Sequence, residues 1–188
     1  MANDQIQLAV IVGSVRTGRI APVVAGWLLS QLSRHCQIST DVIDLADLDL
    51  PANLDGGGDA PVFRKRADAA DAFIIITPEY NHGYPGALKT AIDTAREEWR
   101  AKPVGFVSYG GVAGGLRSVE QLRLVFAELH AVTVRQVVSF HWVHDLFSGD
   151  GQLRDACAAN AAAQAMLAQL SWWACALRKA RAENQYDV

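Results

Sequence analysis

The stretch from Gly13 to Arg19, GSVRTGR, combines residue types that bind phosphate. It joins an apolar run to a segment with helical spacing, so its backbone N–H groups are expected at the positive end of a helix dipole. The Ser14 hydroxyl and the guanidinium groups of Arg16 and Arg19 would converge there and suit a dianionic phosphate. Two arginines at a helix start oppose the dipole unless an anion is present, which favours phosphate binding over a plain turn.

The same stretch lacks two common nucleotide-binding motifs. Gly13 and Gly18 match the first part of GxxxxGK[ST]. Arg19 and Ile20, however, stand where a nucleotide triphosphatase needs its lysine and its magnesium-binding hydroxyl. The dinucleotide fingerprint GxGxxG fails because Val15 stands two positions after Gly13. A cofactor with a single phosphate therefore fits this loop best.

Two further loops carry residues that suit a flat heterocycle. Residues 77–86 read TPEYNHGYPG, and the prolines and tyrosines predict a rigid, partly apolar wall with backbone donors. Residues 108–115 read SYGGVAGG, which would let a ligand approach the backbone closely. Either loop alone is compatible with an ordinary turn, so each supports a ligand site only in combination with the first loop.

Alternating apolar and amphipathic segments would position these loops. The predicted strands cover residues 6–12, 38–44, 72–77, 104–108 and 133–139. The predicted helices cover residues 20–32, 63–70, 86–99, 116–129 and 153–181. The central strands are apolar on both faces, which predicts a parallel α/β sheet covered by helices on both sides. Ligands of such doubly wound sheets bind outside the carboxyl ends of the strands, where the three loops fall.

Composition argues against several classes of function. The chain has 188 residues, 51% hydrophobic and 20% charged, so we expect residues 1–188 to form a single domain. A net charge of −3 with scattered Lys and Arg argues against a nucleic-acid partner. No apolar run reaches the roughly 20 residues that span a bilayer, and the polar start lacks the pattern of a signal peptide. We therefore expect a cytoplasmic protein without a membrane partner.

Other candidate residues carry less weight. His141 and His144 have the spacing of a metal pair, but no further ligands cluster nearby, so a solvated loop is favoured and no metal site is predicted. Glu79 suits either a general base or a structural hydrogen bond. The three cysteines, Cys36, Cys157 and Cys175, form no CxxC motif and are expected to be reduced thiols, with Cys157 and Cys175 too far apart on one helix to be bridged.

Together, the three loops resemble those of the NAD(P)H-dependent FMN reductases of flavodoxin fold, the family that includes bacterial quinone, azo-dye and chromate reductases. GSVRTGR, PEYNHGYPGALKTAID and SYGG occur in the order and spacing of that family, and the resemblance covers about residues 6–145. It implies a flavodoxin-like three-layer sandwich. The five parallel strands of this sandwich would have the order 2-1-3-4-5.

The resemblance also implies which residues hold FMN. Those around the phosphate would be Ser14, Arg16, Gly18 and Arg19. Those along the isoalloxazine ring would be Pro78, Glu79, Tyr80, Asn81 and His82, and those on its opposite edge Ser108, Tyr109, Gly110 and Gly111. Many members have Ser and Asn where this chain has Arg19 and Ala21, so one guanidinium would replace two phosphate contacts.

The implied activity is a ping-pong oxidoreductase. NADPH or NADH would reduce FMN and leave, and a quinone, azo compound, chromate or free flavin would then occupy the same place. Backbone N–H groups near residues 81–83 would stabilise the charge of the reduced ring. Family members are commonly homodimers or homotetramers, and the adjacent Trp172 and Trp173, which cannot both face one core, point the same way.

Two rival functions are kept. The first is a non-enzymatic FMN-binding electron carrier of flavodoxin type. Flavodoxins tend to be strongly acidic and to use a Ser/Thr-rich phosphate loop, and neither property fits this chain. The second is a flavin-free regulatory or structural module, which the colour of the purified protein would distinguish.

Overall fold

All five predicted strands are present and join in one parallel sheet of order β2-β1-β3-β4-β5. The computed structural model describes residues 5–186. The strands are β1 (Ile6–Val12), β2 (Ile38–Asp44), β3 (Ala72–Pro78), β4 (Pro103–Tyr109) and β5 (Val132–Phe140). The predicted strand order is therefore confirmed.

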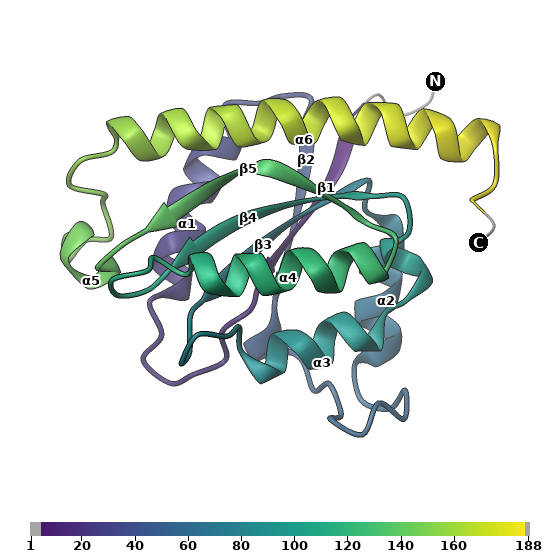
Figure 1. Cartoon of the computed structure of the whole chain (residues 1–188), viewed down its shortest axis with the longest axis horizontal. Coiled ribbons are helices and arrows are strands. Elements are labelled where there is room, and N and C mark those ends of the chain that lie inside the picture. The colour runs from purple at the N-terminus through teal and green to yellow at the C-terminus, as the bar shows by residue number, and fades with distance from the viewer. Residues whose placement is uncertain (1–4, 187–188) are drawn as a thin grey trace.

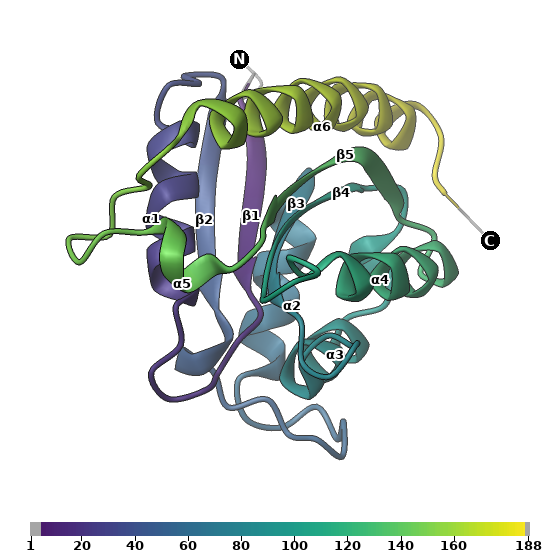
Figure 2. The ribbon, with the colours of Figure 1, turned by 60° about the vertical axis from the view of Figure 1, so that its left-hand side comes forward.

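Helices cover both faces of the sheet (Figures 1 and 2). One layer holds α1 (Ala21–Leu32) and α6 (Cys157–Glu183), and the other holds α2 (Ala60–Ala69), α3 (Gly86–Thr94) and α4 (Leu116–Glu128). Three short elements complete the fold, namely α5 (Val143–Leu146) and the 3-10 turns η1 (Leu45–Asp47) and η2 (Glu97–Trp99). This is the three-layer α/β sandwich that the resemblance implies.

The pleat of the strands divides the core into two clusters. On β1, Leu8 and Val10 pack toward α1 and α6, whereas Ala9 and Ile11 pack toward α2 and α3. Every residue of β3 and β4 is buried, as expected for central strands covered on both sides. The loops that leave the carboxyl ends of these strands therefore start from well-packed, fixed positions.

The predicted helix over residues 86–99 is wrong for its last five residues, because α3 ends at Thr94. The indole N–H of Trp99 donates to the carbonyl oxygens of Ile92 (3.0 Å) and Ala95 (2.9 Å), which satisfies carbonyls that a helix end leaves unpaired. Trp99 is fully buried, with its ring 4.5 Å from that of Phe73. A tertiary aromatic contact thus ends the helix early.

Two other helix starts differ from the prediction. Helix α2 begins at Ala60 instead of residue 63, with a proline in its first turn. Helix α6 begins at Cys157, because Phe147 and Leu153 pair in an isolated bridge and pack against the core under α1. Cys157 and Cys175 lie on α6, as predicted. Within residues 5–186, no helix combines the length and the apolar character needed to cross a membrane.

Candidate functional site

A cavity of about 340 Å³ opens at the carboxyl ends of the strands, where the three loops meet. Its walls come from these loops and from the segment after β5. The sequence-predicted residues that line it are Ser14, Arg16, Gly18, Arg19, Pro78, Glu79, Tyr80, Tyr109, Gly110 and Gly111. The remaining three predicted residues, Asn81, His82 and Ser108, do not line it.

The first loop presents backbone donors that the protein itself leaves free. In the part of the chain that the structure describes, the N–H groups of residues 14–18 donate to no acceptor. Gly13 starts the turn with an N–H bond to the Ile76 carbonyl at 2.8 Å, and a Cβ on Gly13 would lie 3.1 Å from that same oxygen. Gly18 has a φ of +69°, which favours glycine. A row of unpaired N–H groups ahead of α1 suits an anion.

The two arginines of this loop have different surroundings. Arg19 forms a bidentate ion pair with Asp44, at 2.6 and 2.7 Å, and also donates to the Ser14 carbonyl. The hydrogen bond from Arg19 to Asp44 raises the pKa of Arg19. Arg16 is exposed and has no ion-pair partner among residues 5–186. The premise that both arginines need an external anion is therefore wrong for Arg19, whose counter-ion is the last residue of β2.

A buried hydroxyl also faces this cavity without a partner. The phenol of Tyr109 is buried, and its hydroxyl has no hydrogen-bond partner within the described chain, although Ser14 is nearby. The Ser14 hydroxyl is instead 2.8 Å from the hydroxyl of Tyr80. Burial raises the pKa of Tyr109, so it stays a neutral phenol that can donate a proton in a hydrogen bond. An unpaired buried hydroxyl costs about 1–3 kcal/mol, which a polar ligand would offset.

The second loop forms a tight turn. Tyr80 and Gly83 exchange two backbone hydrogen bonds, at 2.8 and 3.1 Å. Between them, Asn81 and His82 have φ values of 50° and 71°, and positive φ at both central residues is the type I′ arrangement. The His82 carbonyl accepts a bond from Gln121 on α4 at 2.9 Å. This turn directs the side chains of Asn81 and His82 to the surface, while their N–H groups remain without an acceptor in the described chain.

Two other predicted residues hold the loops in place. Glu79 accepts from the guanidinium of Arg117 at 2.7 Å and from its backbone N–H at 3.3 Å, in the first turn of α4. Of the two roles considered for Glu79, this pairing favours the structural one. Ser108 is fully buried and donates to the Gly114 carbonyl at 2.8 Å, which closes the glycine loop after β4.

Sequence reasoning missed one wall of the cavity. Its additional lining residues are Ile20, Trp142, Val143, His144 and Asp145. The predicted site residues lie in the loops after β1, β3 and β4, whereas most of these additional residues follow β5. The carboxyl ends of all parallel strands lie at one edge of a sheet, and HWVHD directly after a predicted strand was the available signal. Within the described residues, no group of three His, Cys, Asp or Glu could hold a metal ion.

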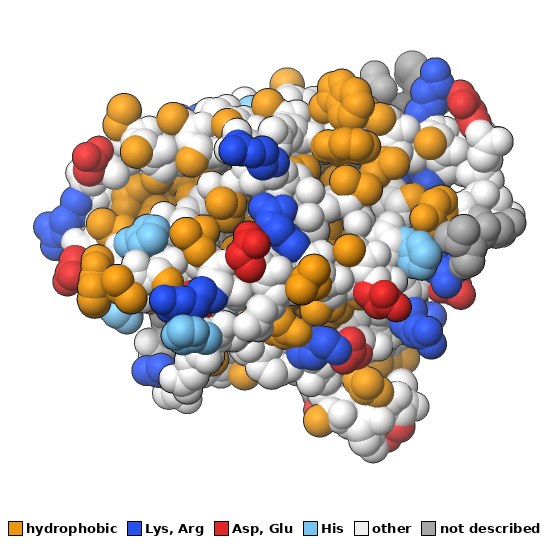
Figure 3. Space-filling model, viewed as in Figure 1, with side chains coloured by type: hydrophobic (Ala, Val, Ile, Leu, Met, Phe, Trp, Pro, Cys, Tyr) orange, Lys and Arg blue, Asp and Glu red, His pale blue; other side chains and the backbone are white. Residues whose placement is uncertain are grey.

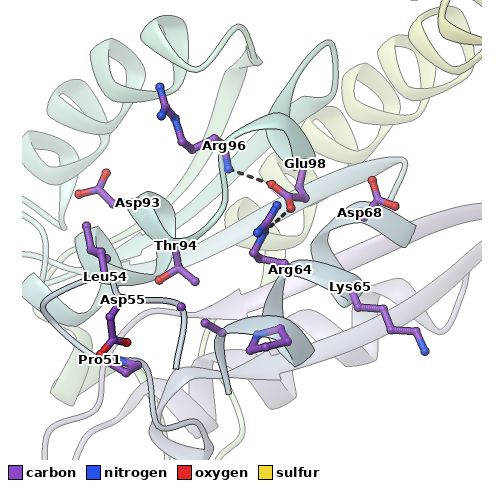
Figure 4. A pocket seen from close by; sticks show the side chains of 13 residues that line it. Pro51, Leu54, Asp55, Arg64, Lys65, Asp68, Asp93, Thr94, Arg96 and Glu98 are labelled. Atoms are coloured by element: carbon purple, nitrogen blue, oxygen red, sulfur yellow. Dashed lines mark hydrogen bonds and ion pairs between the residues drawn. The ribbon is translucent and has the colours of Figure 1, made fainter. Parts of the chain in front are cut away.

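A second cavity, of about 590 Å³, lies beside α2 and the end of α3 (Figure 4). Arg64 and Glu98 point toward each other there, with a hydrogen bond of 2.6 Å, and the Arg96 N–H donates to the same carboxylate at 2.9 Å. Asp93 pairs with Lys89. This cavity is larger than the first, but the chain itself supplies partners for the Glu98 and Asp93 carboxylates. The buried Tyr109 hydroxyl, which has no partner in the described chain, lines the first cavity.

Comparisons with known proteins agree with this geometry. Residues 6–145 match the family model described as NADPH-dependent FMN reductase. An NAD(P)H-dependent FMN reductase of Schizosaccharomyces pombe is 34% identical over 120 residues, which are 58% of this chain and 60% of that protein. A probable NADPH:quinone oxidoreductase of Oryza sativa is 34% identical over 172 residues, 82% of this chain and 85% of the relative.

Solved structures show the same fold. The flavoenzyme NAD(P)H:(acceptor) oxidoreductase FerB of Paracoccus denitrificans superposes with a TM-score of 0.72 at 23% identity, covering 89% of this chain and 97% of that one. The family match spans most of the chain, and the rice relative exceeds 30% identity over most of both sequences. The chain therefore belongs to the NADPH-dependent FMN reductase family.

Proposed function

We propose that this protein is an FMN-dependent oxidoreductase that uses NAD(P)H to reduce a small acceptor, such as a quinone, an azo compound, chromate or free flavin. One observation carries the proposal. The cavity at the carboxyl edge collects unpaired polar groups, namely the N–H groups of residues 14–18, the Arg16 guanidinium and the buried Tyr109 hydroxyl. Phosphate and ribityl hydroxyls are the kinds of group that satisfy them, so the residues fit FMN.

Each loop has a separate task in this proposal. Arg16 and the N–H groups of the first loop hold the phosphate. Gly110 and Gly111 let the backbone approach the flat ring. The N–H groups of Asn81 and His82, which are free in the described chain, follow β3 at the same carboxyl edge and would stabilise negative charge on a part of the ring that extends beyond the cavity.

FMN, when bound, would supply the redox chemistry by accepting a hydride and passing two electrons on. For a quinone the balanced reaction is NAD(P)H + H⁺ + quinone → NAD(P)⁺ + hydroquinone. The protein contributes placement of the reactants and exclusion of water, and a ping-pong cycle follows if donor and acceptor occupy the same face in turn. The alternative function, an electron carrier, would bind FMN without reduction by a free nicotinamide.

The decisive experiment loads the full chain with FMN and adds NADPH or NADH without oxygen. We expect the visible flavin absorbance to fall and to return when a quinone is added. Absorbance that persists with both nucleotides would refute the enzymatic function and favour the electron carrier. Failure of the protein to bind FMN at all would refute both and leave the flavin-free module.

We also propose that the protein is a cytoplasmic single domain that assembles as a homodimer or homotetramer. Trp172 is 65% exposed and packs edge-on against Trp173 at 5.0 Å, and hydrophobic side chains gather over the middle of α6 (Figure 3). An exposed aromatic pair supports a subunit contact. Light scattering should give a mass of two or four chains, and a monomer would refute this assembly.

A further inference from the structure

Trp142, between β5 and α5, has a strained backbone. Its φ of 50° and ψ of 48° place a bulky side chain in the left-handed region, which such residues rarely adopt. Two hydrogen bonds hold the conformation, from the Trp142 N–H to the Gly111 carbonyl at 3.0 Å and from the Val143 N–H to the Gly110 carbonyl at 3.1 Å. The strained residue is thus fixed to the glycine loop that borders the cavity.

Packing within the protein does not explain this strain. The Trp142 side chain is 60% exposed, whereas Trp27 and Trp99 are buried in the two core clusters. In the part of the chain described, no other aromatic ring stacks on Trp142, and its indole N–H has no acceptor. A large flat apolar surface is therefore held at the rim of the cavity without a gain in core burial.

The position of the indole indicates what it contacts. Trp142 lines the cavity, and its Cζ3 atom would lie 3.8 Å from a Cβ added to Gly111. Among the polar groups that suit FMN, Ser14 and Tyr109 are buried and Arg16 is exposed, and all of them come from the loop after β1 and the end of β4, whereas Trp142 lies on the segment after β5. A planar molecule that enters after the cofactor would meet this rim.

From this geometry we propose that Trp142 is a specificity-determining residue whose indole favours planar aromatic acceptors over small inorganic ones. The proposal rests on the proposed function and deepens it by naming the acceptor class. Stacking of an acceptor ring against the indole stabilises its complex, whereas an inorganic ion gains nothing from that surface. The strained backbone keeps the indole at the rim before the acceptor arrives, which reduces the ordering cost of binding.

The test compares acceptors within one set of FMN-loaded variants. Steady-state kcat/KM is measured with a naphthoquinone and with ferricyanide for the wild type, W142A, W142L and W142F. We expect the quinone-to-ferricyanide ratio to fall about tenfold in W142A and W142L, mainly through KM of the quinone, and to be largely retained in W142F. L124A removes a large exposed hydrophobic side chain from α4, away from the cavity, and should leave the ratio unchanged.

Three results would overturn the proposal. One is an unchanged ratio in W142A. Another is a rise in the FMN dissociation constant of W142A that matches the change in quinone KM, since the indole would then contact the cofactor. The last is an equal loss for both acceptors together with slower flavin reduction by NADPH, which would assign the indole to the nicotinamide. A wild-type protein that NAD(P)H does not reduce would refute the proposed function instead.

Discussion

Two cavities of this protein differ in how their polar groups are satisfied. Beside α2, the buried Glu98 carboxylate accepts from Arg64 and from the N–H of Arg96, so the chain provides partners for this buried charge (Figure 4). The exposed side chains there that form no ion pair within residues 5–186 are those of Lys65, Asp68 and Arg96. At the carboxyl edge of the sheet, Arg16 and the Tyr109 hydroxyl have no such partner within residues 5–186. The contrast favours the carboxyl-edge cavity as the ligand site, although the cavity beside α2 has the larger volume.

The largest expected effect is on FMN affinity, which should depend on an arginine of the carboxyl-edge cavity and not on one of the cavity beside α2. R16A removes the exposed guanidinium of the first loop and should raise the FMN dissociation constant about tenfold to a hundredfold, because charged hydrogen bonds to phosphate are lost. R64A removes an arginine from the other cavity and should leave that constant unchanged. Fluorescence titration with FMN measures both variants.

Titration with riboflavin sharpens this prediction. Riboflavin lacks the phosphate, so R16A should bind it as the wild type does. An equal loss of riboflavin and FMN affinity would contradict the assignment of Arg16 to the phosphate.

The next effect concerns the ion pair of Arg19 with Asp44, which replaces the direct contact of Arg19 with phosphate that the sequence predicts. R19A leaves the Asp44 carboxylate without its partner beside the phosphate loop, and should raise the FMN dissociation constant about tenfold. Adding D44N removes that charge, so the double variant R19A/D44N should recover most of the lost affinity. If Arg19 bound phosphate directly, the double variant would bind as weakly as R19A.

A smaller effect is expected for Y109F, which should raise the stability of the apoprotein and lower its affinity for FMN. Y109F removes a buried hydroxyl that has no hydrogen bond, so the free energy of unfolding of the apoprotein should rise by about 1 kcal/mol. The same change should lower FMN affinity a few-fold. Denaturant titration and FMN titration check the two halves, and a less stable apoprotein would show that the hydroxyl has a partner in solution.

The smallest expected effect is a pH dependence of the free energy of unfolding, caused by the Glu98–Arg64 pair of the cavity beside α2. Burial raises the pKa of Glu98, but hydrogen bonds from Arg64 and the backbone outweigh it and hold the pKa below its ordinary value. The pair therefore stabilises the fold above the unfolded-state pKa, and this contribution is lost as pH falls through the lower folded-state value. E98Q should lose stability at neutral pH and converge with the wild type in acid. Denaturant titration at neutral and acidic pH measures this, and an equal difference in the free energy of unfolding between E98Q and the wild type at both pH values would contradict it.

The strands were predictable because their signal is local. β1 and β2 match their predicted bounds, since continuous or alternating apolar runs define them without reference to partners. The end of α3 was not predictable, because the indole of Trp99 caps it from outside the helix. That the chain is one cooperative domain stays a prediction.

The same distinction between local and tertiary signals applies to the candidate site. Three loops at strand ends were readable from residue types, and ten of the residues named for them line one cavity. The Arg19–Asp44 pair was not readable, because Asp44 belongs to β2 and only the strand order brings it beside the first loop. Trp142 was missed because its importance comes from its backbone conformation and exposure, which residue type alone does not show.

The Arg19–Asp44 pair has a consequence for the apoprotein. The internal carboxylate neutralises one of two neighbouring cations, and Arg19 also holds the Ser14 carbonyl. The loop therefore does not depend on the cofactor to relieve the repulsion between its two arginines. Because Arg19 already fixes part of the loop to β2, less ordering entropy would be lost when FMN binds. Such a loop suits a protein that takes up FMN reversibly from solution after it has folded.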